Sequence, residues 1–183
     1  NTNYKLAELE YLLKNADSWS QYRRILKMSR RPVIVGGCGR SGTTLLLSLL
    51  SAHPNLYVIP EETGAFCVDL YTGNETTELH MDILYNHLLD AEVSFEGRSR
   101  WCEKTPMNVH AVDPLLDYFG TEMRFLHMVR DGRDVVTSRH PKKPNTYWVS
   151  PERWIRDVRA GRDAERHPQV MTVQYEELVE DHI

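Results

Sequence analysis

Short apolar runs alternate along the chain with longer stretches in which apolar residues recur at helical spacing. The short runs predict strands over residues 33–35, 56–59, 100–102, 123–129 and 170–174. The helical spacing predicts a helix pair or one bent helix over 4–28 and further helices over 43–52, 76–90, 113–119 and 150–166. Strands that alternate with helices favour an α/β domain with a mainly parallel sheet, whose ligands bind beyond the carboxyl ends of the strands.

Capping residues sharpen several of these boundaries. Asp113 is the expected N-cap of the helix over 113–119, Pro114 its first residue, and Gly120 its end. Ser150, followed by proline, starts the helix that runs to about residue 166. The chain contains neither an internal repeat nor a low-complexity linker, so we expect a single domain.

Composition narrows the class of protein. Of the 183 residues, 41% are hydrophobic and 26% charged, and no apolar run approaches the roughly 18 residues of a membrane span. The net charge of −4 argues against a nucleic-acid partner. This charge is uneven, with +5 in residues 1–60, −10 in 61–122 and +1 in 123–183. An anionic ligand should therefore meet the outer segments, and the acidic middle segment disfavours a strongly acidic peptide acceptor.

Cysteine and histidine usage predicts neither disulfides nor a metal site. The three cysteines form no CxxC pair, and no His or Cys pair with zinc-site spacing is backed by a second pair. Reduced thiols favour the cytoplasm. The chain begins at Asn1 without a signal-like run, so a trimmed N-terminal anchor and a Golgi location form the alternative.

A glycine-rich turn between the first strand and the next helix has the context of a phosphate-binding loop. Gly37 and Gly42 are separated by four residues and followed by Thr43 and Thr44. A nucleotide triphosphatase would need lysine where Thr43 stands, because that lysine reaches the β and γ phosphates. The cation here is Arg40, inside the loop, which suits a nucleotide with a single 5′-phosphate. The alternative is a turn of purely geometric origin.

A second basic group follows the strand over 123–129. This run carries Arg130 to the carboxyl edge of the sheet, beside the phosphate loop if the two strands are neighbours. Ser138 lies about two helical turns further on if residues 133–139 are helical, and could join Arg130 at a second anionic group. For Arg133, Asp131 and Asp134 we expect ion pairing and helix capping instead.

Two segments resemble the nucleotide-binding signatures of sulfotransferases that use 3′-phosphoadenosine 5′-phosphosulfate (PAPS). They are VIVGGCGRSGTTLLLSLLSAHPNL at 33–56 and FLHMVRDGRDVVTSR at 125–139. Supporting matches follow in the expected order: PEET at 60–63, EKTP at 103–106 and VQYEELV at 173–179. The similarity is greatest to the group of bacterial and tyrosylprotein sulfotransferases. It implies a P-loop-like three-layer fold, with helices on both sides of the central sheet.

The resemblance also implies roles for individual residues. The 5′-phosphosulfate would be held by Gly39, Arg40, Ser41, Gly42, Thr43 and Thr44, and the 3′-phosphate by Arg130 and Ser138. Glu62 would be the catalytic base, and Lys104, with Arg40, would stabilise the leaving group. The sulfuryl group would pass by in-line displacement to a hydroxyl of a sugar, peptide or small metabolite. Adenosine 3′,5′-bisphosphate would be the product, and no metal would be required.

Several alternatives stay open at this point. Glu61 and Glu62 could cap a helix after Pro60, and Lys104 could form a surface ion pair. Pro106 stands where cytosolic sulfotransferases place a histidine, which leaves His110 as a weaker candidate base. The competing functions are a P-loop kinase and a non-catalytic nucleotide-binding domain. Because domains of this family usually exceed 200 residues, we expect the 183 residues to form a domain truncated at its C-terminus.

Overall fold

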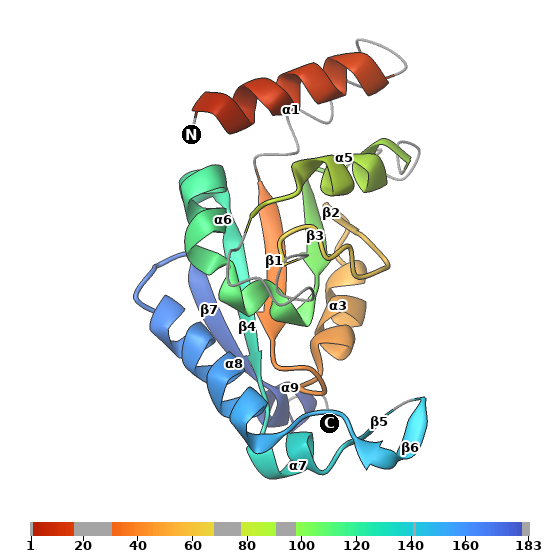
Figure 1. Cartoon of the computed structure of the whole chain (residues 1–183), viewed down its shortest axis with the longest axis vertical. Helices are drawn as coiled ribbons and strands as arrows, with labels where there is room; N and C mark the ends of the chain where they lie inside the picture. Colours follow the sequence, from red (N-terminus) through yellow and green to blue (C-terminus); the bar gives the residue numbers. More distant parts are fainter. Residues whose placement is uncertain (1, 17–30, 68–77, 91–97, 141, 181–183) are drawn as a thin grey trace.

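A five-stranded parallel sheet forms the centre of the molecule (Figure 1). The computed structural model describes residues 2–16, 31–67, 78–90, 98–140 and 142–180. The strands are β1 (Pro32–Gly37), β2 (Leu56–Val58), β3 (Arg100–Lys104), β4 (Arg124–Val129) and β7 (Val170–Gln174). Their order is β2-β3-β1-β4-β7, and every neighbouring pair is parallel. The expected α/β fold is therefore confirmed.

Helices cover both faces of this sheet. Helices α3 (Thr43–Ser51) and α9 (Tyr175–Glu180) pack on one face, with Val35, Leu126 and Met128 of the strands. The 3₁₀ helix η2 (Pro106–His110), α6 (Val112–Phe119) and α8 (Pro151–Ala164) lie on the other face. This gives the three layers that the resemblance implied.

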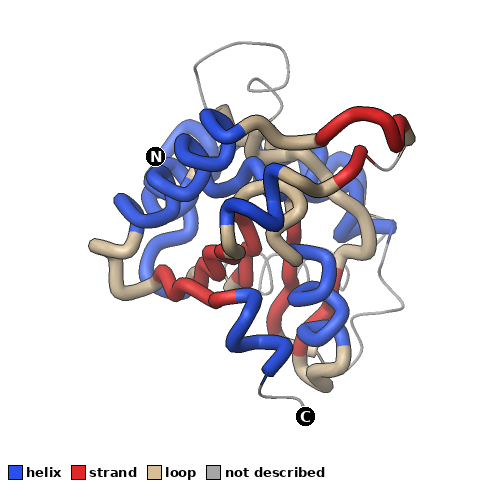
Figure 2. Tube along the Cα trace, turned by 90° about the horizontal axis from the view of Figure 1, so that it is seen from below, coloured by secondary structure: helices blue, strands red, loops and turns tan. Residues whose placement is uncertain are grey.

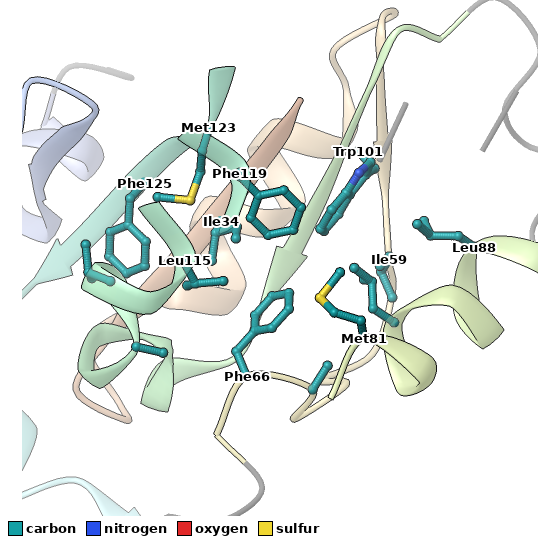
Figure 3. Packing of buried hydrophobic residues seen from close by; sticks show 14 of the residues in the cluster. Ile34, Ile59, Phe66, Met81, Leu88, Trp101, Leu115, Phe119, Met123 and Phe125 are labelled. Atoms are coloured by element: carbon teal, nitrogen blue, oxygen red, sulfur yellow. The ribbon is translucent and has the colours of Figure 1, made fainter. Parts of the chain in front are cut away.

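The larger core lies on the α6 side (Figure 3). The rings of Trp101, Phe119 and Phe66 meet edge to face, with centroids 5.9 and 6.4 Å from that of Phe119. Helices α1 (Thr2–Asn15) and α5 (Met81–Asp90) extend this core through Leu12 and Leu84. Ile34 faces this cluster while its neighbour Val35 faces the other, so β1 is buried on both sides, as its continuous apolar sequence predicts.

Most expected boundaries agree with the structure, but the starts of α5 and α6 differ. Helix α5 begins at Met81, so residues 78–80 of the expected helix over 76–90 are not helical. The second difference is the start of α6. This helix begins at Val112 and its N-cap is Ala111, so the assignments of Asp113 as N-cap and Pro114 as first residue are wrong. The Asp113 carboxylate instead pairs with Arg166 at 2.7 Å and His167 at 2.9 Å. Ser150 does cap α8, by accepting a hydrogen bond from the Arg153 backbone amide. The expected helix over 4–28 is described only as far as α1 and Ala16; residues 17–30 lie outside the described part.

The segment after Arg130 also differs from expectation. Helix α7 (Gly132–Val136) is shorter than the expected 133–139, and a two-stranded hairpin follows it, β5 (Arg139–His140) and β6 (Lys143–Tyr147). Figures 1 and 2 both show this hairpin projecting from the body of the molecule. All five β6 residues are exposed, which explains why no apolar pattern marks this strand in the sequence.

The three cysteines, Cys38, Cys67 and Cys102, are free and buried. In the described part of the chain, none of the helices has the length and apolar character needed to cross a membrane.

Burial of His127 on β4 predicts an acid-sensitive stability. Burial lowers the pKa of this imidazole from 6.5 to about 4, so the unfolded chain binds its proton first and stability falls as pH drops through this window. Between about pH 7.5 and pH 5, His127 should cost about 2 kcal/mol of unfolding free energy. Urea unfolding at both pH values measures this loss, and a His127→Gln variant should lose correspondingly less. An equal loss in both proteins would show that His127 is not responsible.

Candidate active site

The carboxyl ends of three adjacent strands bring the expected site residues to one edge of the sheet. The phosphate loop follows β1, Lys104 ends β3, and Arg130 follows β4, with β1 between the other two strands. Figure 2 looks onto this edge from below. The expectation that Arg130 lies beside the loop depended on β1 and β4 being neighbours, and their pairing is confirmed.

The loop from Gly37 to Gly42 needs glycine at two points. Gly37 has φ +150°, and a Cβ atom there would lie 2.3 Å from the Met128 carbonyl oxygen. Gly42 has φ +96°, and its Cβ would meet the Tyr175 ring at 2.5 Å. Arg40 adopts a left-handed conformation, with φ 71°, and its side chain is exposed. The packing thus fixes a tight loop with its cation on the outside.

The polar groups of this loop suit an anion. Gly42 is the N-cap of α3 and supplies no side-chain cap, which leaves the first helical amides, at Thr43 and Thr44, available to a ligand. The Ser41 hydroxyl is buried and has no hydrogen-bond partner among the described residues. Thr43 is buried and Thr44 exposed. An unpartnered buried hydroxyl beside free amides fits a bound phosphate or sulfate group.

Trp148 and Arg153 cover the loop at Gly39. A Cβ atom on Gly39 would lie 3.2 Å from Trp148 Nε1 and 3.6 Å from an Arg153 guanidinium nitrogen. Arg153 in turn lies 3.5 Å from the buried carboxylate of Asp157 on α8. No sequence motif marks these two residues, because only the packing of α8 against β1 brings Arg153, and Trp148 just before α8, to the loop.

Asp157 is the centre of a buried polar network. It accepts hydrogen bonds from His110 Nε2 at 2.8 Å and from Arg156 at 3.0 Å. Burial alone would raise the pKa of the Asp157 carboxyl, but these hydrogen bonds bring it below its ordinary value. Burial and the nearby Asp157 raise the pKa of the Cys38 thiol to about 12, so this cysteine is not a ready nucleophile. Because His110 Nε2 is hydrogen-bonded to Asp157, this imidazole nitrogen already has a partner.

Lys104 and Glu62 form a direct ion pair across 42 positions of sequence. The Lys104 side chain is only 6% exposed, whereas the Glu62 side chain is 47% exposed. A buried ammonium therefore faces a carboxylate that solvent and a ligand can reach. Glu61, in contrast, is exposed and lies 3.8 Å from His87.

A buried glutamate next to Lys104 holds this region together. Glu103 accepts hydrogen bonds from the backbone amide and the hydroxyl of Thr63, from the Thr105 hydroxyl and from the side-chain amide of Asn108. Burial raises the pKa of the Glu103 carboxyl, and these hydrogen bonds oppose that rise. Because Thr63 follows Glu62 directly, Glu103 fixes the backbone that presents the Glu62 carboxylate.

Arg130 and Ser138 lie around the same short helix. Arg130 pairs with the Asp134 carboxylate at 3.1 Å, and the Ser138 hydroxyl donates to the Asp134 backbone carbonyl at 2.8 Å. The Arg130 guanidinium stacks over the Tyr175 ring at 4.3 Å, and its buried Nε has no hydrogen-bond partner in the described part of the chain. Arg130 and Ser138 thus lie on either side of α7, and both contact Asp134 of that helix.

The neighbouring charges are structural, as expected. The Asp131 carboxylate pairs with Arg133 at 2.6 Å and accepts a hydrogen bond from the Arg133 amide, which caps α7. The Asp131 amide donates to Glu176 of α9 at 2.9 Å. Within the described residues, no group of three or more His, Cys, Asp or Glu side chains could hold a metal ion.

Comparison with known proteins places these features in a family. A model of the sulfotransferase family matches residues 32–83 and 67–183. A protein-tyrosine sulfotransferase of Drosophila melanogaster is 25% identical over 173 residues, which cover 80% of this chain and 34% of that protein. Protein-tyrosine sulfotransferase 1 of Danio rerio is 28% identical over 127 residues, covering 61% and 36%. The chain therefore spans about a third of the length of these relatives.

Solved structures show the same fold. Sulfotransferase STF1 from Mycobacterium tuberculosis superposes with a TM-score of 0.56 at 16% identity, covering 93% of this chain and 68% of that one. A sulfotransferase from Alicyclobacillus acidocaldarius gives a TM-score of 0.54 at 18% identity, covering 82% and 76%. Since the family model spans most of the sequence, the chain belongs to the sulfotransferase family.

Proposed function

We propose that this protein is a PAPS-dependent sulfotransferase that transfers a sulfuryl group to a hydroxyl acceptor. One observation carries the proposal. The phosphate loop, which lacks the lysine of a kinase loop, and the buried Lys104, which is paired with Glu62, lie at the ends of the adjacent strands β1 and β3. The register places Lys104 opposite Val35, two residues before the loop begins. The family supplies the reaction class, and the geometry suggests which residues perform it.

The donor would be held at two ends. Arg40, the Ser41 hydroxyl and the Thr43 and Thr44 groups would bind the 5′-phosphosulfate, because the loop offers free amides and an unpartnered hydroxyl there. Gly39 and Gly42 would let the backbone come close to the anion. Arg130 and Ser138 would bind the 3′-phosphate.

The proposed chemistry needs one base and one fixed cation. PAPS supplies the sulfuryl group and an adenosine 3′,5′-bisphosphate leaving group. Glu62 would accept the proton of the acceptor hydroxyl while the acceptor oxygen bonds to sulfur. Lys104, with Arg40, would stabilise the negative charge on the phosphate oxygen whose bond to sulfur breaks. The Lys104–Glu62 pair would therefore separate as acceptor and donor enter between them.

The acceptor is proposed from the relatives. Both relatives described above are protein-tyrosine sulfotransferases, so the phenolic hydroxyl of a protein tyrosine is the first acceptor to test. Sugar and small-metabolite hydroxyls form the remaining candidates, because the base and cation described here need only an O–H group.

Nucleotide binding tests the donor assignment. Isothermal titration of the purified protein should show binding of adenosine 3′,5′-bisphosphate without magnesium, and weaker or no binding of ATP with magnesium. The reverse preference would overturn the proposal in favour of a phosphotransferase. Against that alternative, Thr43 stands where a kinase loop needs its lysine.

Arg130 should set the selectivity for the 3′-phosphate. Arg130→Gln is expected to weaken adenosine 3′,5′-bisphosphate binding about ten- to a hundredfold, since a charge-assisted contact is lost, while adenosine 5′-phosphate binding changes little. The matched control is Arg133→Gln, whose guanidinium is 90% exposed and paired with Asp131. Titration of both nucleotides into the unmodified protein, Arg130→Gln and Arg133→Gln measures the effect. Equal weakening of both nucleotides would contradict the assignment.

A further inference from the structure

Three arginines meet at the amino edge of the sheet, opposite the candidate active site. Arg31 precedes β1, Arg100 begins β3 and Arg124 begins β4. The strand register brings them level, because Pro32 pairs with Trp101 and Val33 pairs with Arg124. Arg31 lies six positions before Gly37, where the phosphate loop begins, which corresponds to about 20 Å along β1.

These arginines line a cavity of about 530 Å³. His53 and Asn55 contribute polar groups, and Val33, Leu50 and Leu56 form an apolar wall. Within the described part of the chain, the lining contains no aspartate or glutamate. The cavity therefore combines three cationic side chains with an apolar surface.

The arginines are only partly neutralised by their described neighbours. Arg31 pairs with Glu122 at 2.9 Å, whereas Arg100 donates to the Glu122 backbone carbonyl and Arg124 to those of Thr121 and Met123. One described carboxylate thus offsets three positive charges, which leaves a net charge of about +2. Like charges on adjacent strands repel one another, and a bound dianion would relieve that repulsion.

Three further observations point to an oxyanion. The buried Nε of Arg100 has no hydrogen-bond partner among the described residues. Burial lowers the pKa of Arg100, and the positive charges of Arg31 and Arg124 lower it further. His53 Nδ1 accepts from the Asn55 amide at 3.2 Å, so its Nε2 remains a donor.

We propose that this amino-edge cavity, lined by Arg31, Arg100 and Arg124, is a second anion site that binds a phosphate monoester with an apolar body. A phosphate monoester carries two negative charges and so matches the net +2 of the described side chains Arg31, Arg100, Arg124 and Glu122, whereas a sulfate monoester carries one. The apolar wall of the cavity contacts the organic part. The site is independent of the proposed sulfuryl transfer, because it uses other residues at the other edge of the sheet.

Titration with small esters tests this site. The probes are phenyl phosphate, phenyl sulfate and inorganic phosphate, added to protein saturated with adenosine 3′,5′-bisphosphate at a pH where the phosphate ester is doubly ionised. Phenyl phosphate should bind most tightly, because it alone combines the double charge with an apolar group. Equal binding of phenyl phosphate and inorganic phosphate would overturn the apolar part of the proposal. The absence of phenyl phosphate binding would overturn the whole of it.

Variants locate the binding. Arg124→Gln should weaken phenyl phosphate binding about tenfold or more, whereas Arg159→Gln, at an exposed position of α8, should not. Glu122→Gln should tighten binding severalfold, because it frees Arg31, and this gain cannot result from misfolding.

Arg40→Gln distinguishes the two anion sites, because it should leave phenyl phosphate binding intact whether or not the loop binds PAPS. Loss of binding in Arg40→Gln, or no change in Arg124→Gln and Glu122→Gln, would overturn the proposal.

Discussion

Replacing Lys104 with methionine is expected to lower kcat for sulfuryl transfer about a hundred- to a thousandfold. The reason is that the proposed stabilisation acts on charge that develops in the transition state, and the loss of one such fixed group has this size. Methionine keeps most of the length of the side chain at a position only 6% exposed, and the carboxylate that it leaves unpaired, Glu62, is half exposed. Folding should therefore be preserved. Steady-state rates at saturating donor and acceptor measure the effect.

The matched control for this variant is Lys14→Met, which removes an exposed lysine of α1. It should have the activity of the unmodified protein. A Lys104→Met enzyme that keeps its kcat but binds the donor poorly would contradict the proposed role, because it would place Lys104 in ground-state binding alone.

Replacing Glu62 with glutamine should have a comparable effect, a fall in kcat of about a hundred- to ten-thousandfold. Glutamine can still accept the hydrogen bond from Lys104, but it cannot take the proton of the acceptor. The pH–rate profile should also lose the limb that reports ionisation of this carboxylate. A variant with the same profile as the unmodified enzyme would show that another group is the base.

Two neighbouring variants distinguish the alternatives for this base. Glu61→Gln changes the adjacent carboxylate, which is exposed and lies near His87. His110→Gln changes the imidazole that is bound to the buried Asp157. Both should retain kcat within severalfold. If His110→Gln instead abolished the ionisation in the profile, the base would be His110 acting with Asp157.

The fold could be predicted where local sequence and burial agree. The run Val33–Val35 is apolar and β-branched, is preceded by proline and ends at two glycines, and β1 is found there with both faces buried. The prediction from local sequence fails at Asp113. This residue type is favourable as an N-cap, but the Asp113 carboxylate pairs with Arg166 and His167 and the N-cap is Ala111. None of the described strand residues of the hairpin, Arg139–His140 and Lys143–Tyr147, is fully buried, so no hydrophobic pattern could reveal these strands.

Only the parts of the site that form continuous sequence motifs could be predicted. The phosphate loop is continuous in sequence, and its position between β1 and α3 follows from the strand–loop–helix pattern. The Lys104–Glu62 contact depends on the parallel pairing of β3 between β1 and β2, which only the folded chain displays. The hydrogen bonds that Glu103 and Asp157 accept could not be predicted, because the sequence does not distinguish a buried carboxylate from one on the surface.

The most direct test of the central claim follows the sulfuryl group itself. The purified protein is incubated with PAPS carrying radiolabelled sulfur and with tyrosine peptides, phenols and sugars as acceptors. We expect label to appear in a hydroxyl-bearing product, with one adenosine 3′,5′-bisphosphate released for each label transferred, and we expect Lys104→Met and Glu62→Gln to abolish most of this transfer. Transfer of a phosphoryl group from ATP to the same acceptors, without transfer from PAPS, would contradict the account.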